Sequence, residues 1–474
     1  MNNISLIRPA VILCVCALLG TSCQKYVDIK TQGKVVPGAW LNYRYLLNYT
    51  SNFNGGVSIP DYASDDAQLV DGSYQVSSLV ASDYYGFAGR AYSWQPVVYP
   101  NTGYYYTDAN WDNCYSNITN ANVVIEEVPA VTDATEDQKN ELMAEAMVHR
   151  ADAYLMLVNT YAKTYDASTA ASDPGVPLVL VETTTQSLVR QSIQQTYDQI
   201  IKDLKTAAPN LPVSQTYNML PSRASAFAEL ARCYLYMNLY DSANRYADSV
   251  LSYRSTLNDL GSYSAPLDAS VYPLQKNDPE LLLLKNAAYG STGYSPNSIR
   301  LSDTLLSVLG TTDQRYALFT LDAASVGYSY TAAGGRFWIR DRVMGEARNV
   351  GPTVPEMMLI KAEYYARSGD AASAMNWVNK LRVKRFKPAD YTDMIATDAS
   401  DAVVQVIKER EREFFCRMLR WWDMRRLKSE ARFRQTLTRS YNGTTYTLDP
   451  SSNRYVFQIA PYYLKLNPEI QQNP

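Results

Sequence analysis

Apolar residues recur at helical spacing in several stretches of the chain, and long polar and aromatic connections separate these stretches. A helix that packs against others repeats its apolar positions every three to four residues. This spacing predicts helices over residues 40–49, 111–128, 135–163, 192–208, 223–251, 355–386 and 403–433. The helix over 135–163 is expected to be capped by Asp133 and Glu136. Residues 51–110 and 253–351 are predicted to be rich in loops.

Small and aromatic residues predict paired antiparallel helices within the helical stretches. In 223–251, and in similar order in 355–386, alanines let two helices approach closely while aromatic residues fill the gaps. Residues 142–161 and 196–207 form a third expected pair, which an insertion at 162–189 splits. This is the packing logic of tetratricopeptide repeats, although no fixed period recurs. The pattern predicts an all-α fold of tetratricopeptide-like helix pairs with long irregular, tyrosine-rich insertions.

The N-terminal residues predict export from the cytoplasm. Arg8 precedes a short apolar run at 10–20, and the small residues 20–22 lead directly to Cys23. The run is too short to span a membrane, which takes about 20 apolar residues, and it is typical of a signal peptide. A cysteine directly after small residues resembles a bacterial lipobox, in which the thiol is acylated. We therefore predict a signal peptide at 1–22 and a lipidated tether at 23–40; an ordinary secretory signal is the alternative.

Charge and cysteine content exclude several classes of protein. The formal net charge of the 474 residues is −3, from 44 basic and 47 acidic side chains, so a nucleic-acid partner is not expected. Beyond the signal and tether only Cys114, Cys233 and Cys416 remain, too few and too scattered for a disulfide framework or a metal site. We predict that Cys233 and Cys416 are buried.

The body is expected to comprise an N-terminal region, 41–220, packed with a C-terminal region, 221–474.

The single histidine, His149, argues against metal and nucleophilic catalysis. One histidine makes neither an HExxH zinc site nor a three-histidine cage, and this one falls inside a predicted helix. A buried, hydrogen-bonded structural histidine is the expected role. We predict no catalytic residue, metal or cofactor, and no enzymatic activity.

Acidic residues alternate with arginines near the C-terminus. Glu409, Glu411 and Glu413 predict a salt-bridged helix surface, and Arg420, Asp423 and Arg426 are spaced to pair on one helix face; the six are read as structural. Carboxylates surrounded by guanidinium groups are held ionised, which does not suit a general acid.

Tyrosine outnumbers phenylalanine 39 to 10, which favours a ligand with both apolar and hydroxyl surfaces, such as a sugar. Many tyrosines lie at helical packing spacing, but those in residues 83–111 and 287–294 do not. Trp94 is the leading candidate for a stacking platform, and the alternative that it packs its loop onto the helices stays open. The expected companions are Tyr84, Tyr85, Tyr104, Tyr105, Tyr289 and Tyr294, with Asn101 or Asn110 as hydrogen-bonding partners.

Several motifs together resemble the SusD/RagB family of outer-membrane nutrient-binding lipoproteins. Residues 409–414 and 420–426 are similar to the family's Glu-Arg-x-x-Glu-Phe and Arg-Trp-x-Asp-Leu-x-Arg patterns. Further segments agree in the family's order: 111–122, 196–212, 277–284 with 313–315, 355–370 and 458–474. Ala460 departs from the proline that the family often has.

The resemblance implies a non-enzymatic binding protein, anchored by lipid at the outer membrane and exposed at the cell surface. Such proteins cover a SusC-like, TonB-dependent barrel transporter and deliver oligosaccharides, or less often peptides, to it. An anchored glycoside hydrolase and a purely structural tetratricopeptide adaptor are the remaining alternatives. A hydrolase needs a suitably placed carboxylate pair, whereas the acidic clusters here fall on helices.

Overall fold

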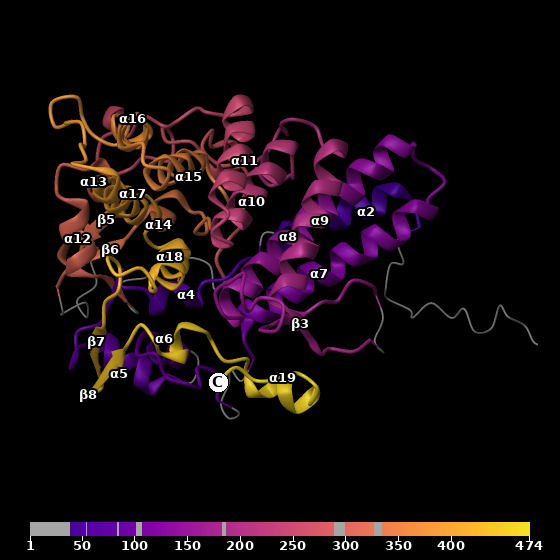
Figure 1. Ribbon diagram of the computed structural model, residues 1–474, viewed down its shortest axis with the longest axis horizontal. Coiled ribbons are helices and arrows are strands. Elements are labelled where there is room, and N and C mark those ends of the chain that lie inside the picture. The colour runs from indigo at the N-terminus through magenta and orange to yellow at the C-terminus, as the bar shows by residue number, and fades with distance from the viewer. Residues whose placement is uncertain are drawn as a thin grey trace, which may run out of the picture.

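Long antiparallel helices form the upper part of the molecule in Figure 1. The structure, a computed structural model, describes residues 38–53, 55–82, 85–100, 107–182, 186–288, 299–326 and 334–474. The long helices are α7 (Ala109–Glu127), α8 (Glu136–Tyr161), α9 (Ile193–Ala207), α10 (Arg223–Tyr236), α11 (Tyr240–Tyr253), α15 (Val354–Arg367), α16 (Ala371–Arg382) and α17 (Ala399–Phe414).

These helices pack in a continuous series. Helix α8 lies against α7 and α9, α9 against α10, α10 against α11, α11 against α15, and α15 against both α16 and α17. Alanines at the contacts are fully buried, including Ala231 and Ala243 between α10 and α11. The all-α fold and all three predicted helix pairs are thereby confirmed, with α8 and α9 as the pair that an insertion splits.

Side-chain caps fix where the helices begin. Thr135 and Gln138 form a capping box at the start of α8, in which the Thr135 hydroxyl accepts from Gln138 N at 3.3 Å and the Gln138 amide accepts from Thr135 N at 2.9 Å. The predicted cap, Asp133 with Glu136, was wrong by two residues. Asp133 instead accepts a hydrogen bond from the backbone of Trp40, at the start of α2 (Trp40–Leu47).

Shorter elements make up the rest of the described chain. The helices are α3 (Thr50–Phe53), α4 (Ile59–Ala63), α5 (Tyr74–Ala81), α6 (Gly86–Tyr92), α12 (Asp303–Leu309), α13 (Gln314–Phe319), α14 (Arg340–Met344), α18 (Leu419–Leu427) and α19 (Pro461–Leu466). The strands form antiparallel pairs: β1 (Ala67–Gln68) with β4 (Arg300–Leu301), β2 (Pro174–Pro177) with β3 (Arg190–Ser192), β5 (Thr320–Asp322) with β6 (Arg336–Trp338), and β7 (Leu437–Tyr441) with β8 (Thr444–Leu448).

The stretch 51–110 is more ordered than the sequence predicted. It contains α3 to α6 and β1, where loops were expected. These helices are too short to show a clear apolar period, and they are stabilised by burial, as for Phe87 and Tyr92 of α6.

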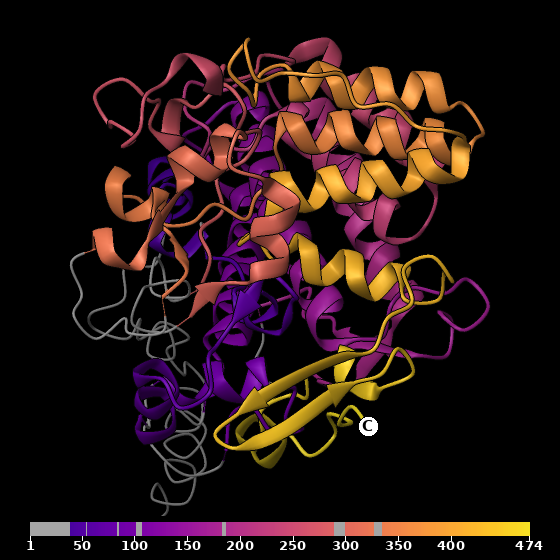
Figure 2. The ribbon, with the colours of Figure 1, turned by 90° about the vertical axis from the view of Figure 1, so that its left-hand side faces the viewer.

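The two ends of the body meet in a lower layer (Figures 1 and 2). The β7–β8 hairpin lies beside α5 and α6, and α18 packs on α4. The hydroxyl of Tyr463 in α19 accepts from Asp108 N at 2.9 Å and donates to Asp112 at 2.6 Å, at the start of α7. Segments about 350 residues apart in the chain therefore build one surface.

One large hydrophobic core continues from α4 and α6 through α8, α10 and α15 to α18. A smaller cluster around Tyr43 and Leu47 fixes α2 to α7 and α8. Cys233 and Cys416 are buried in the large core, as predicted, and so is Cys114; all three are free thiols.

Residues 1–37, which include the predicted signal peptide, Cys23 and most of the tether, lie outside the described residues. Within the described part, no helix is both long enough and apolar enough to cross a membrane.

Candidate ligand-binding surface

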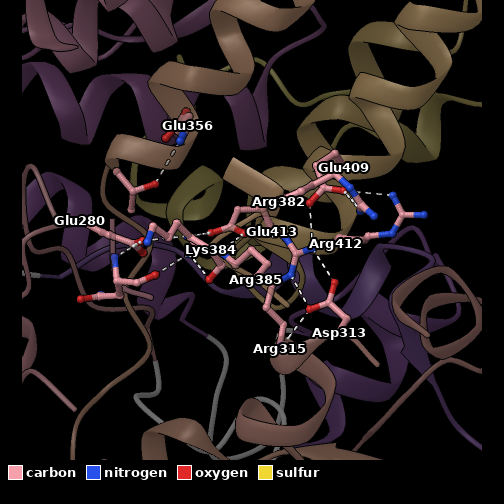
Figure 3. A network of polar contacts seen from close by, with 12 residues as sticks. Glu280, Asp313, Arg315, Glu356, Arg382, Lys384, Arg385, Glu409, Arg412 and Glu413 are labelled. Carbon is pink, nitrogen blue, oxygen red and sulfur yellow. Dashed lines mark hydrogen bonds and ion pairs between the residues drawn. The ribbon is translucent and has the colours of Figure 1, made fainter. Parts of the chain in front are cut away.

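The acidic residues Glu409, Glu411 and Glu413 of α17 are salt-bridged, as predicted, but they are buried and do not form a solvated helix surface. Figure 3 shows how they join arginines from other elements. The Glu409 carboxylate, fully buried, pairs with Arg315 at 2.7 Å, Arg382 at 2.9 Å and Arg412 at 3.1 Å. These residues are buried because α12, α15, α16 and α18 all pack against α17.

These carboxylates are held ionised by their partners. Burial alone would raise the pKa of Glu413, but the charges of Arg385 at 2.9 Å and Arg315 at 2.6 Å outweigh it and bring the pKa to about 2. The pKa of Glu409 is likewise lowered, because three guanidinium groups outweigh its burial. Neither group is a proton donor at neutral pH, so both suit a structural role.

The charged residues of α18 form only some of the predicted ion pairs. Asp423 pairs with Arg426 at 2.8 Å, but its other partner is Arg410 of α17 at 2.7 Å. Arg420 does not bind Asp423; its Nε and one terminal nitrogen both reach Asp65 at 2.6 Å. Because α18 packs on α4, Arg420 faces the residues that follow α4, and the spacing along α18 does not reveal this.

His149 has the structural role that the sequence predicted. Its side chain is 1% exposed, Lys285 Nζ lies 2.9 Å from its Nδ1, and the Phe53 ring packs against it at 4.8 Å. Burial and the Lys285 charge lower its pKa well below the usual value, so the imidazole is neutral at neutral pH.

The structure places three of the predicted ligand residues. Tyr84, Asn101, Tyr104, Tyr105, Tyr289 and Tyr294 lie outside the described residues. Tyr85 immediately precedes α6 and is 38% exposed. Asn110 is fully buried, and its Oδ1 accepts from the backbone of Ser58 at 2.7 Å and Ile59 at 3.2 Å. Its amide therefore fixes the start of α4 and does not face a ligand.

Trp94 lies in the core. Its side chain is 6% exposed, and its Nε1 donates to the Ala63 carbonyl at 2.9 Å. The Arg439 guanidinium lies 4.4 Å from the Trp94 ring and 4.2 Å from the Tyr92 ring, between the two. This burial favours the packing role, which the sequence left open, over a stacking platform.

A groove lies beside Tyr85, where α5 and α6 face the β7–β8 hairpin. We call it the hairpin groove. It consists of two adjoining hollows, of about 220 and 520 Å³, that share Asn442. The first is lined by Leu79, Val80, Gly86, Arg90, Gln95, Tyr441, Asn442, Thr444 and Tyr446, and the second by Asp71, Gly72, Ser73, Val76, Ser77, Asn442 and Gly443.

The tip of the hairpin is fixed to the turn before α5. Asn442 and Gly443 have φ angles of 51° and 72°, which suit a tight two-residue hairpin turn. The Asp71 carboxylate accepts from Gly72 N at 3.1 Å and from Gly443 N at 2.8 Å. The hydrogen bond from Gly443 therefore joins the hairpin to the opposite wall of the groove.

Two tyrosines of the hairpin face α6. The Tyr441 hydroxyl lies so close to Gly89 that a Cβ there would be 2.0 Å from it. The Tyr446 ring is half-buried, and its hydroxyl accepts a long hydrogen bond from Gln95 Nε2 at 3.4 Å. Half-exposed aromatic faces beside amide, guanidinium and hydroxyl groups can stack on an apolar sugar face and hydrogen-bond to its hydroxyls.

Sequence reasoning missed Tyr441, Tyr446, Gln95 and Arg90. The Asn-Gly pair at 442–443, flanked by alternating residues, is a hairpin signal that predicts β7 and β8. No local signal places this hairpin against α6.

Two family models match separate parts of the chain. Residues 63–235 match a family model described as "Starch-binding associating with outer membrane", and residues 354–474 match the model of the SusD family. A SusD-like protein of Formosa agariphila is 23% identical over 423 residues, which cover 77% of this chain and 78% of that protein.

Solved structures share the fold at low identity. A SusD superfamily protein from Bacteroides thetaiotaomicron superposes with a TM-score of 0.71 at 19% identity, covering 92% of this chain and 100% of that one. Surface glycan-binding protein A from Bacteroides uniformis gives a TM-score of 0.71 at 15% identity, covering 91% and 99%. A SusD-like carbohydrate binding protein from Bacteroides vulgatus gives 0.66 at 18% identity, covering 92% and 98%.

Proposed function

Because the chain belongs to the SusD/RagB family, we propose that it captures oligosaccharides at the cell surface and delivers them to a SusC-like, TonB-dependent transporter in the outer membrane. The observation that carries the proposal is the hairpin groove, in which Tyr446, Gln95 and Arg90 offer an aromatic face and hydrogen-bonding groups side by side. The matched family description names starch and the outer membrane, and two of the similar structures are of proteins named for glycan or carbohydrate binding.

The proposed role is binding without hydrolysis. Glycoside hydrolysis uses one carboxylic acid as proton donor and a second carboxylate facing it across the sugar. The acidic residues Glu409 and Glu413 of α17 are paired with arginines and have lowered pKa values. They do not line the hairpin groove.

Affinity electrophoresis of the mature protein tests the proposal. Gels that contain one polysaccharide each, from a panel of neutral and acidic glycans, are run beside gels without glycan, and casein peptides are tested by calorimetry. We expect at least one glycan to retard the protein and no reducing sugar to be released from it. Binding to peptides alone would replace glycans by oligopeptides as the cargo. Turnover that is lost on a single Asp or Glu substitution would contradict a binding role.

We further propose that acyl chains on Cys23 hold the protein at the outer membrane. Each buried CH₂ adds about 0.8 kcal/mol of membrane affinity, so several chains anchor firmly. The Cys23→Ala variant should therefore move from the detergent phase to the aqueous phase on Triton X-114 partitioning, or accumulate with its signal uncleaved. Cys16→Ala, in the apolar part of the signal, is the matched control and should leave partitioning unchanged. Equal partitioning of the Cys23→Ala variant and the natural protein would contradict the anchor.

A further inference from the structure

A second cleft lies between α17, α18 and the segment that leads to β7, separate from the hairpin groove. We call it the α17–α18 cleft. Its volume is about 270 Å³. It is lined by Val404, Ile407, Lys408, Glu411, Arg420, Met424, Leu427, Arg432, Phe433, Arg434, Gln435 and Tyr455.

Apolar side chains and one tyrosine form the buried lining of the cleft. Ile407, Met424 and Leu427 are buried. Tyr455 is 3% exposed, and its ring stacks on Trp421 with the ring centres 5.2 Å apart. Within the part of the chain that the structure describes, the Tyr455 hydroxyl has no hydrogen-bond partner. The Tyr455 side chain lines the cleft, so its hydroxyl can hydrogen-bond to a ligand bound there.

Four basic side chains and one acidic side chain line the cleft. Arg420 is paired with Asp65 at 2.6 Å and with Glu411, the one acidic residue of the lining, at 3.3 Å. Arg432 pairs with Glu430 at 3.2 Å. Lys408 and Arg434 are exposed, and among the described residues neither has an ion pair.

We propose that the α17–α18 cleft binds an acidic sugar unit, a uronate of a glycan. The apolar face of the sugar ring lies on Met424 and Leu427, the Tyr455 hydroxyl hydrogen-bonds to a ring hydroxyl, and Lys408 and Arg434 bind the carboxylate. A neutral sugar would give neither cation an ion pair, and a bare inorganic anion would leave the apolar lining uncovered. The cleft thus gives the protein a preference for acidic glycans. This proposal rests on the proposed function, because it takes glycans as the cargo.

A matched pair of ligands tests the charge requirement. Tetragalacturonate and its carboxyl-reduced counterpart differ only in the carboxyl groups, and isothermal titration calorimetry measures both. We expect tetragalacturonate to bind at least tenfold more tightly, with an affinity that falls as sodium chloride is raised from 50 to 500 mM. Equal affinity for the two tetrasaccharides, or binding of tetragalacturonate that is indifferent to salt, would overturn the proposal.

Variants locate the binding. Lys408→Ala/Arg434→Ala should weaken tetragalacturonate binding tenfold or more, and Tyr455→Phe severalfold, both without a change in melting temperature. The control variant Lys202→Ala/Arg245→Ala removes the same charge from exposed positions on α9 and α11. It should bind tetragalacturonate and its carboxyl-reduced counterpart as the natural protein does. An unchanged affinity in the cleft variants would overturn the proposal.

The hairpin groove provides the control that separates this inference from the proposed function. One outcome is that neutral glycans bind and lose affinity in the Tyr446→Ala variant, while tetragalacturonate does not bind at all. The cleft proposal then fails, and glycan capture stands. If tetragalacturonate binding depends on Lys408 and Arg434 but not on Tyr446, the cleft proposal is supported. Loss of tetragalacturonate binding with Tyr446→Ala alone would assign that ligand to the hairpin groove and overturn the cleft as its site.

Discussion

The helix pairs and the hairpin layer use the same residue types for different purposes. In the helix pairs, tyrosines recur at packing spacing and face one another: Tyr234 of α10 stacks on Tyr246 of α11 with ring centres 5.6 Å apart and planes 7° apart. In the hairpin layer, the Tyr446 ring stays partly open beside the Gln95 amide and the Arg90 guanidinium. A tyrosine count therefore says little about ligand binding, whereas the surroundings of each ring separate packing from recognition.

Charged residues show the same contrast. Among the helix pairs and α18, the fully buried carboxylate of Glu363 receives two guanidinium groups, from Arg426 at 2.6 Å and Arg367 at 2.8 Å. At the hairpin, Asp71 is satisfied by backbone N–H groups and Asn442 is exposed. Paired charges in the core stabilise one arrangement of helices, while the exposed polar groups of the groove remain available to a ligand.

Replacing Trp94 is expected to have the largest effect on stability. Trp94→Ala leaves a cavity, the Ala63 carbonyl without its donor, and Arg439 with one aromatic face uncovered, so unfolding should become easier by about 3–5 kcal/mol. Thermal unfolding measures this, with Tyr45→Ala as a control at a 62% exposed position. A loss of glycan affinity with an unchanged melting temperature would instead make Trp94 part of the ligand surface.

Neutralising a buried carboxylate of the helix pairs is expected to have the second-largest effect on stability. Burial alone would raise the pKa of Glu363, but Arg426 and Arg367 lower it from 4.5 to about 2. A lowered folded-state pKa stabilises the protein above pH 4.5, and this contribution is lost as the pH falls from 4.5 toward 2. At pH 7, Glu363→Gln should cost roughly 3 kcal/mol, and the cost should shrink as the solution is acidified toward pH 2.

Urea unfolding at pH 7 and at pH 3 checks this dependence. Glu136→Gln, at a side chain that is 80% exposed, is the control and should change stability little at either pH. An equal cost of Glu363→Gln at both pH values would show that the carboxylate charge is not what stabilises this site.

Gly89 offers a smaller and more local perturbation. Alanine normally stabilises a helix relative to glycine by about 1 kcal/mol, but a Cβ at Gly89 would lie 2.0 Å from the Tyr441 hydroxyl. Gly89→Ala should therefore destabilise by about 1–2 kcal/mol and shift the hairpin. Gly38→Ala, where a Cβ meets nothing within 4 Å, is the control for thermal unfolding. A stabilised Gly89→Ala variant would mean that Tyr441 moves away at no cost.

The helix pairs were predictable from sequence because their signals are local. Spacing, small residues and caps lie within one helix or its immediate neighbour, and α8 to α11 and α15 to α16 follow them. The burial of Glu409 was not predictable, since its partners Arg315 and Arg382 come from other elements. The Asn-Gly pair at 442–443 is also a local signal, for the hairpin of β7 and β8, although no strand was predicted there.

The ligand surface was predictable only in part, for the same physical reason. The predicted stretch from Asp83 to Trp111 does border the groove, at Gly86, Arg90 and Gln95. The opposite wall is contributed by Tyr441 and Tyr446, about 350 residues later. Trp94 has no packing period, yet it is buried because Arg439, from the distant β7, covers it. Contacts between distant segments leave no periodic trace in either segment.

The glycan affinity of Tyr446→Ala tests the central claim, that ligand binds in the hairpin groove, most directly. Calorimetry with the glycan that most strongly retards the natural protein should show affinity reduced about tenfold, or ~1.4 kcal/mol, because one stacking face is lost. The melting temperature should change little, since the ring is half-exposed, and Tyr45→Ala on α2 should bind like the natural protein. Unchanged affinity in Tyr446→Ala would contradict the claim and place the ligand away from the hairpin groove.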